Sequence, residues 1–279
     1  MEKLKVLIPT DFSVQAEYAY LLVKRLEEKI EMDIHFLHVL DVPETVTLSA
    51  TGVIETCGEI DVNFVKSKKE IADRKLSNLK KIYGNGINIH LVFGKITSSI
   101  TSFATGNKFD LIVMGTKGAW GLKEKLSGSE TQVIARQSEI PLLSMMCDRS
   151  DLSIENILLV HDFSKPENEN LKLMHTLIRA FNPKVHLLQI VTGESEKIWT
   201  LTQMDKFAEI NQITNFEKHL LTDKDVESGV IHFNQMHEMD IICIGTRGRK
   251  GIDTIIHPSA TEKLINHLFK PIISFHLAH

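Results

Sequence analysis

Residues 5–13 read Lys-Val-Leu-Ile-Pro-Thr-Asp-Phe-Ser and align without a gap on residues 156–164, which read Asn-Ile-Leu-Leu-Val-His-Asp-Phe-Ser. Residues 109–118 read Phe-Asp-Leu-Ile-Val-Met-Gly-Thr-Lys-Gly and align as closely on residues 239–248, Met-Asp-Ile-Ile-Cys-Ile-Gly-Thr-Arg-Gly. Two long landmarks that recur in the same order are typical of a duplicated structural unit. The sequence therefore predicts one structural plan used twice.

This repeat divides the 279-residue chain into two expected domains, residues 1–149 and residues 150–279. Each is long enough to bury a core of its own. The second copy is shorter by 21 residues, because the alignment offset falls from 151 at the first landmark to 130 at the second. The missing piece maps to residues 41–61, which show no sustained hydrophobic period. We expect that stretch to be a long excursion over the surface.

Short apolar runs alternate with stretches of helical period within each copy. The runs are continuous rather than alternating, which indicates strands buried on both faces of a parallel sheet. We expect an α/β fold of two tandem Rossmann-like, doubly wound domains, each with a five-stranded parallel sheet. The expected strands of the first copy are Lys5–Pro9, Ile34–Leu40, Ile87–Phe93, Leu111–Gly115 and Pro141–Met146. One expected helical face carries Ala16, Ala19, Tyr20, Val23 and Leu26.

The composition is that of a globular protein, with 43% hydrophobic and 24% charged residues. A net charge of −4 gives no electrostatic reason to expect nucleic acid or a membrane as a partner. The three cysteines form no CxxC pair, which argues against a disulfide framework and a zinc ribbon. The first apolar run is too short for a signal peptide, so the expected location is cytoplasmic.

A glycine-rich stretch follows the expected fourth strand. Gly115 and Gly118 are three residues apart, and Gly128-Ser129 comes directly before a helix expected to begin at Glu130. Glycine lets the backbone come close to a ligand, and the first N–H groups of a helix attract an anion. Because doubly wound sheets bind ligands at the carboxyl ends of their strands, we expect this stretch to hold phosphate. The plain alternative is that the glycines only shape loops and Ser129 is an ordinary helix cap.

The pattern Gly-x2-Gly-x9-Gly-Ser, with an aspartate just past the first strand, resembles the ATP-binding class of the universal stress protein family. The resemblance covers both halves, so the chain looks like a tandem member. It implies that the first half binds ATP, or AMP or ADP, together with Mg²⁺ or Mn²⁺. The residues implied to bind the nucleotide are Pro9, Thr10, Asp11, Val39, Gly115, Gly118, Gly128, Ser129 and Glu130.

The resemblance also implies a role for each position. Asp11 would contact the nucleoside, the Val39 backbone would meet the adenine edge, and Gly115 would lie beside the ribose. The residues from Gly118 to Glu130 would cradle the phosphates. An alternative for Asp11 is that Asp-Phe-Ser merely starts a helix, and both roles can hold together.

The second half departs from this pattern. Pro258 stands where the first half has its third glycine, and proline has no N–H to offer a phosphate. Losing one such bond weakens binding by about ten- to a hundredfold. His161 also replaces Thr10, which places an imidazole where the nucleoside would come. We therefore expect a weaker second site, built from the retained positions Asp162, Gly245, Gly248 and Ser259.

The 13 histidines raise the question of a metal site. His232 and His237 are close together on an expected helix, but a spacing of five does not place them on one face. His35, His38 and His186 fall in or beside strands, where an imidazole commonly has a structural role. No dedicated metal site and no catalytic residue is expected.

The expected last strands, residues 141–146 and 271–276, are sheet edges, and exposed edges tend to be paired. The resemblance implies that units of this family dimerise through that strand. In a tandem chain the two halves can instead pair internally, as a pseudo-dimer about a pseudo-two-fold axis. A further homodimer is left open.

Three functions remain open from sequence. The first is a stress-response binding or regulatory module, because the phosphate cradle comes without evident machinery to activate a water, and at most slow ATP hydrolysis is expected. The second is a nucleotidyl- or phosphoryl-transfer enzyme, with His161 or Lys117 as the reacting group. The third is a ligand-free interaction scaffold in which both sites are vestigial.

Overall fold

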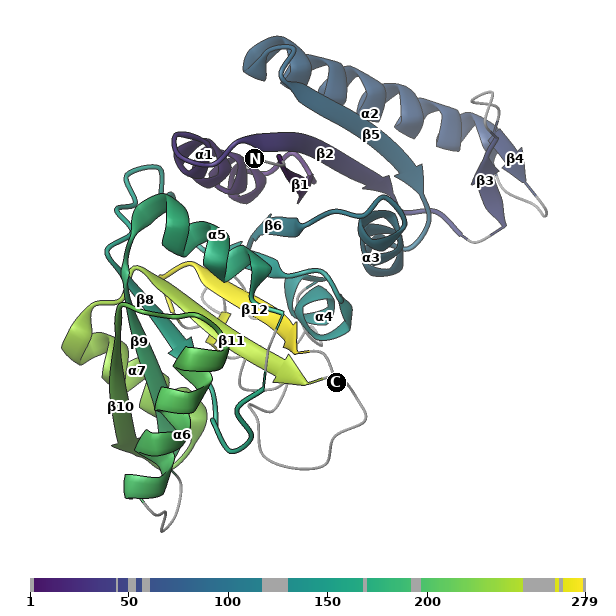
Figure 1. Ribbon diagram of the computed structural model, residues 1–279. Helices are drawn as coiled ribbons and strands as arrows, with labels where there is room; N and C mark the ends of the chain where they lie inside the picture. The colour runs from purple at the N-terminus through teal and green to yellow at the C-terminus, as the bar shows by residue number, and fades with distance from the viewer. Residues whose placement is uncertain are drawn as a thin grey trace.

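One sheet of ten strands runs through the computed structural model, which describes residues 3–43, 45–49, 54–56, 61–116, 130–167, 170–191, 197–247, 264–265 and 268–277 (Figure 1). The first copy contributes β1 (Leu4–Pro9), β2 (Met32–Leu40), β5 (Ile87–Phe93), β6 (Leu111–Gly115) and β7 (Leu142–Met145). The second copy contributes β8 (Asn156–Val160), β9 (Lys184–Val191), β10 (Phe216–Thr222), β11 (Ile241–Arg247) and β12 (Ile272–Leu277).

The two halves of the sheet have the same strand order. The whole sheet runs β10-β9-β8-β11-β12-β7-β6-β1-β2-β5, and every neighbouring pair within a half is parallel. The first strand of each copy thus lies at the centre of its half, as in a doubly wound sheet. The predicted fold class, two tandem Rossmann-like repeats, is confirmed.

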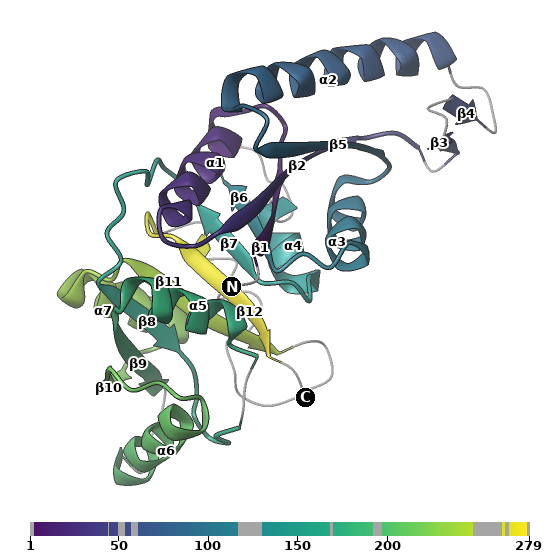
Figure 2. The same cartoon turned by 45° about the horizontal axis from the view of Figure 1, so that its top comes forward.

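The halves join through their last strands. β7 and β12 pair antiparallel, with Leu143 opposite Ile273, and lie side by side near the middle of the molecule in Figure 2. The Ser144 hydroxyl adds a bond to the carbonyl of Ile272 at 3.4 Å. The pairing of the last strands within one chain is therefore as the sequence predicts, and it leaves neither strand as an edge of this sheet.

Helices cover both faces of the sheet. α1 (Val14–Glu27), α2 (Val62–Tyr83), α5 (Lys172–Phe181) and α6 (Lys197–Ile210) pack on one apolar core. α3 (Ile96–Gly106), α4 (Glu130–Gln137) and α7 (Val226–His237) pack on the other. Each core draws residues from both halves of the chain, and the predicted face of α1 is buried throughout. No helix in the described ranges is long and apolar enough to cross a membrane.

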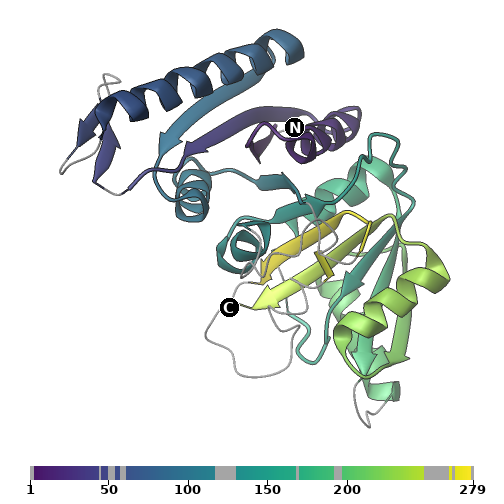
Figure 3. The same ribbon diagram turned by 180° about the vertical axis from the view of Figure 1, so that it is seen from behind.

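The stretch expected to be a surface excursion carries a hairpin, β3 (Val46–Leu48) and β4 (Ile54–Thr56), at the outer end of α2 (Figure 3). Val46 is only 3% exposed and packs in a small separate core with Leu40, Val42 and Val65. Strands of three residues are too short to give a hydrophobic period. The sequence therefore offered no signal for them.

Candidate functional site

The carboxyl end of β1 enters a tight turn that starts α1. The Thr10 hydroxyl accepts the amide of Phe12 at 3.0 Å, and Asp11 Oδ1 accepts the amide of Ser13 at 2.9 Å. These bonds hold Phe12 at a φ of +66°, a conformation that bulky residues rarely adopt. Ser13 then caps α1 by accepting the amide of Ala16. The helix-starting role considered for Asp11 is thus present, and Asp11 remains exposed.

β2 continues past the end of β1 beside this turn. Pro9 pairs with Leu37 as the last residue of β1, so Val39 lies beyond the end of β1. His38 donates its Nδ1–H to the carbonyl of Thr10 at 2.8 Å, and its ring lies 4.6 Å from the ring of Phe12. His38 has the structural role expected of it. The carboxyl ends of β1 and β2 therefore bring together Pro9, Thr10, Asp11 and Val39.

Gly115 ends β6 at the same end of the sheet. A Cβ atom on this residue would lie 1.9 Å from the carbonyl oxygen of Gln15, in the first turn of α1. Only glycine allows β6 and α1 to approach this closely. Packing alone therefore requires a glycine here, while its place beside a ribose stays a prediction.

Carboxylates gather where α4 begins. Desolvation raises the pKa of Glu130 above its ordinary value, and the negative charges of Asp11 and Asp41 raise it further. Asp41 was not among the site residues expected from sequence. It comes directly after β2 and therefore lies at the carboxyl end of that strand. Gly118, Gly128 and Ser129, the rest of the expected phosphate cradle, lie outside the described residues.

The second copy repeats the turn with one exchange. Asp162 Oδ1 accepts the amide of Ser164 at 3.0 Å, as Asp11 does in the first copy. The amide of Phe163, which has a φ of +51°, donates to Nδ1 of His161 at 2.9 Å. The imidazole therefore takes over the acceptor role of the Thr10 hydroxyl.

Aromatic rings fill the interior of this second turn. His161 is 3% exposed and Phe163 is fully buried, and the centroids of both rings lie about 5 Å from the ring of Phe207 in α6. The imidazole expected at the nucleoside position is thus packed into the core. Gly245 is buried in β11, while Gly248 and Ser259 lie outside the described residues.

A group of possible metal ligands lies elsewhere, on β9 and β10. His186, Glu217 and His219 have donor atoms within 4.8 Å of one another. Sequence reasoning missed this group because it compared histidines along a helix, whereas these residues meet across two strands. The repeat held a signal: His35 recurs as His186 at the first offset of the alignment.

Comparison with known proteins agrees with this architecture. The sequence model described as "Universal stress protein family" matches residues 4–144. The universal stress protein MJ0577 of Methanocaldococcus jannaschii is 31% identical over 149 residues, which are 50% of this chain and 92% of that protein. The universal stress protein MJ0531 of the same organism is 30% identical over 139 residues, 50% of this chain and 79% of that protein.

A solved structure extends the likeness to both halves. The crystal structure of a universal stress protein from Archaeoglobus fulgidus DSM 4304 superposes with a TM-score of 0.74 at 20% identity. The match covers 98% of this chain and 96% of that one. At this identity the likeness shows the fold alone, and the fold it shows is the tandem one.

Proposed function

The chain belongs to the universal stress protein family, and from this premise we propose that its N-terminal half binds ATP, or another adenine nucleotide, as a stress-response binding and regulatory module. The proposed site is the edge of the sheet where β1, β2 and β6 end. Its described members are Pro9, Thr10, Asp11, Val39, Gly115 and Glu130. Gly118, Gly128 and Ser129, which lie outside the described residues, are proposed to complete it.

The difference in exposure between the two copies of the turn is the main support for this proposal. Both copies hold the turn with an aspartate and a phenylalanine of positive φ. In the first copy Asp11 is exposed and Phe12 only half-buried, so a ligand can reach the turn. In the second copy Phe163 is fully buried against Phe207. The first turn is therefore more open to a nucleotide than the second, where Asp162 is half-buried.

The negative charge at the carboxyl ends of these strands favours a nucleotide that is bound together with a cation. The negative charges of Asp11 and Asp41 add to the rise in the pKa of Glu130, and carboxylates at this end of the sheet would repel a bare triphosphate. Carboxylates and phosphate oxygens are the ligands that Mg²⁺ and Mn²⁺ prefer. These side chains therefore fit a nucleotide bound together with Mg²⁺ or Mn²⁺.

The burial of His161 argues against the transfer-enzyme alternative. A reacting group must come within hydrogen-bond reach of the phosphate, and His161 is enclosed by aromatic rings and 3% exposed. Lys117, the other candidate, lies outside the described residues. The binding module, with at most slow hydrolysis, is the function that these observations support best.

Matched substitutions in the two turns test the proposal. Asp11→Ala removes an acceptor for the Ser13 amide, whereas Asp162→Ala removes an acceptor for both the amide and the hydroxyl of Ser164. The melting temperature of each variant without nucleotide is therefore its own reference. Adding ATP and Mg²⁺ at a hundred times the dissociation constant stabilises a binding protein by about 2.7 kcal/mol. That rise in melting temperature should persist in Asp162→Ala and shrink in Asp11→Ala.

Three results would speak against the site. Equal loss of the ATP response in both variants would mean that the second turn contributes as much as the first. An undiminished response in Asp11→Ala would remove that residue from the site. No response in the unsubstituted protein would favour a ligand-free scaffold.

A further inference from the structure

The second half carries a cluster of side chains that the proposed nucleotide site does not use. We propose that His186, Glu217 and His219 bind a divalent transition-metal ion, with Zn²⁺ as the best fit. The three residues lie on the adjacent strands β9 and β10, where Glu217 pairs directly with His186 in register. The inference is independent of nucleotide binding, because these strands belong to the other half of the chain.

The donor atoms have the separations that one small ion requires. His186 Nδ1 lies 2.9 Å from His219 Nε2, and Glu217 Oε2 lies 3.8 Å from each of these nitrogens. A point equidistant from three atoms so spaced lies about 2.1 Å from each, which is within the usual range for nitrogen and oxygen ligands of Zn²⁺. An ion between them would replace the present contact of the two imidazoles with two coordinate bonds.

Neighbouring side chains orient two of the three donors. His186 Nε2 lies 3.2 Å from Asn156 Oδ1, an atom that can only accept. The ring proton of His186 is thereby held on Nε2, and the lone pair of Nδ1 faces the cluster. Lys184 donates to Glu217 Oε1 at 2.6 Å, which leaves Oε2 for the ion. Outer partners of this kind are typical of metal-binding histidines and carboxylates.

The position of the cluster suits entry and retention of an ion. The side chain of His186 is 7% exposed and that of His219 is 20% exposed, whereas that of Glu217 is 48% exposed. β10 is the edge strand of the sheet, so the carboxylate side is open to solvent. The centroids of the Phe233 and His237 rings lie 4.8 and 5.5 Å from that of the His219 ring. These two rings screen the histidine donors of the cluster from water.

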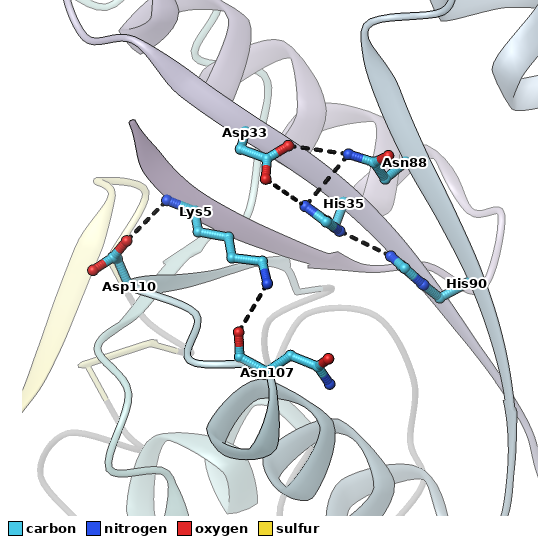
Figure 4. Close-up of polar contacts among 7 residues, drawn as sticks. All are labelled: Lys5, Asp33, His35, Asn88, His90, Asn107 and Asp110. Atoms are coloured by element: carbon cyan, nitrogen blue, oxygen red, sulfur yellow. Dashed lines mark hydrogen bonds and ion pairs between the residues drawn. The ribbon is translucent and has the colours of Figure 1, made fainter. Parts of the chain in front are cut away.

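The first copy has the same histidine pair, but its carboxylate, Asp33, contacts the other ring nitrogen of His35, Nε2. His35 Nδ1 lies 2.8 Å from His90 Nε2, and Asp33 accepts from His35 Nε2 (Figure 4). Asn88 stands on β5 where Glu217 stands on β10, and its amide nitrogen donates to Asp33 at 3.0 Å. The histidine pair is therefore common to both copies, and among the described residues only the second copy adds an anionic third ligand. The first copy serves as an internal control.

Metal titration of the full-length, untagged protein tests the inference. The protein is stripped with a chelator and titrated with Co²⁺, whose visible absorption reports a site of low coordination number, and then with Zn²⁺ as competitor. We expect one Co²⁺ per chain, displaced by Zn²⁺. His219→Gln should abolish the site, and Glu217→Gln should weaken it at least tenfold. His90→Gln, the matched change in the first copy, should leave it intact.

The variants keep the test decisive. Glu217→Gln changes an exposed side chain to an amide like that of Asn88, so its fold is expected to survive even where His219→Gln does not. No Co²⁺ bound to the unsubstituted protein would overturn the proposal. So would a Glu217→Gln protein of unchanged affinity, or a site lost in His90→Gln. Any of these would leave the two imidazole pairs as structural hydrogen bonds.

Discussion

Gly115 is required by packing, whatever it contributes to a ligand. The atoms that a Cβ would meet include the backbone carbonyl of Gln15, 1.9 Å away, which cannot rotate aside. Gly115→Ala should therefore lower the free energy of unfolding by about 1–3 kcal/mol, measured by urea denaturation without nucleotide. Gly106→Ala is the control, because a Cβ there meets nothing within 4 Å. A Gly115→Ala protein as stable as the parent would contradict this account of the close approach.

His219 should make the metal-free protein sensitive to acid. Burial, together with the neighbouring imidazoles of His186 and His237, lowers the pKa of His219 from 6.5 to about 4. The unfolded chain then takes up this proton first as the pH falls. Stability is present above about pH 6.5 and is lost towards pH 4, by up to roughly 3 kcal/mol from this group.

The measurement is the free energy of unfolding at pH 7 and pH 4.5 for the parent and for His219→Gln. The parent should lose more stability than the variant over this interval. His232→Gln is the control, since His232 is 57% exposed and paired with Asp223 at the surface. Equal losses in the parent and His219→Gln would refute the assignment of this acid sensitivity.

Single residues show where sequence reasoning reached its limit. The Asp11 turn was predictable, because its residues are neighbours in the chain. The burial of His161 was not, because Phe207 lies on a helix far along the sequence and encloses the ring only after folding. The histidine cluster was missed for a similar reason. Its members meet through the register of two strands, which hydrophobic periodicity does not reveal.

The hairpin of β3 and β4 should behave as a separate unit. Val46 packs with Leu40, Val42 and Val65 in a core of its own, apart from the two main cores. Segments with so few apolar contacts open locally, without global unfolding. Val46→Ala should cost the hairpin about 2 kcal/mol and speed amide exchange there roughly thirtyfold, with little change in global stability.

Hydrogen exchange and urea denaturation together make this measurement. Val14→Ala is the matched control, because Val14 is 53% exposed while Val46 is 3% exposed. A drop of similar size in the global free energy of unfolding would contradict local opening. It would mean that the hairpin folds together with the sheet.

Longer elements were predictable and the shortest were not. Ile87–Phe93 and Leu111–Gly115 have the predicted bounds, because continuous apolar runs end at turn residues there. β1 and β2 begin only slightly before their predicted starts. The hairpin strands escaped detection because three residues cannot establish a period, and their burial depends on contact with α2.

The two copies of the repeat fold together as one structural unit. The ten strands form a single sheet, and both apolar cores run through both halves within the described residues. The repeat predicted the tandem fold, whereas the pairing of the last strands was expected because these strands are sheet edges and because the family resemblance implies it. The register of β7 against β12 depends on side-chain packing between halves and could not be predicted. The boundary between residues 149 and 150 stays a prediction.

Duplication has left two similar turns with different surroundings, and this asymmetry is the basis of the proposed function. The first turn is open and lies among carboxylates, whereas aromatic rings enclose the second. The proposed metal site on β9 and β10 lies in this second copy.

Counting bound nucleotide per chain tests the central claim most directly. Equilibrium dialysis of the full-length protein against labelled ATP and Mg²⁺ gives this number without assuming any mechanism. We predict that binding saturates at one ATP per chain, with a second at least tenfold weaker. Two equivalent sites would contradict the asymmetry of the two turns, and no binding at millimolar ATP would contradict the proposed function itself.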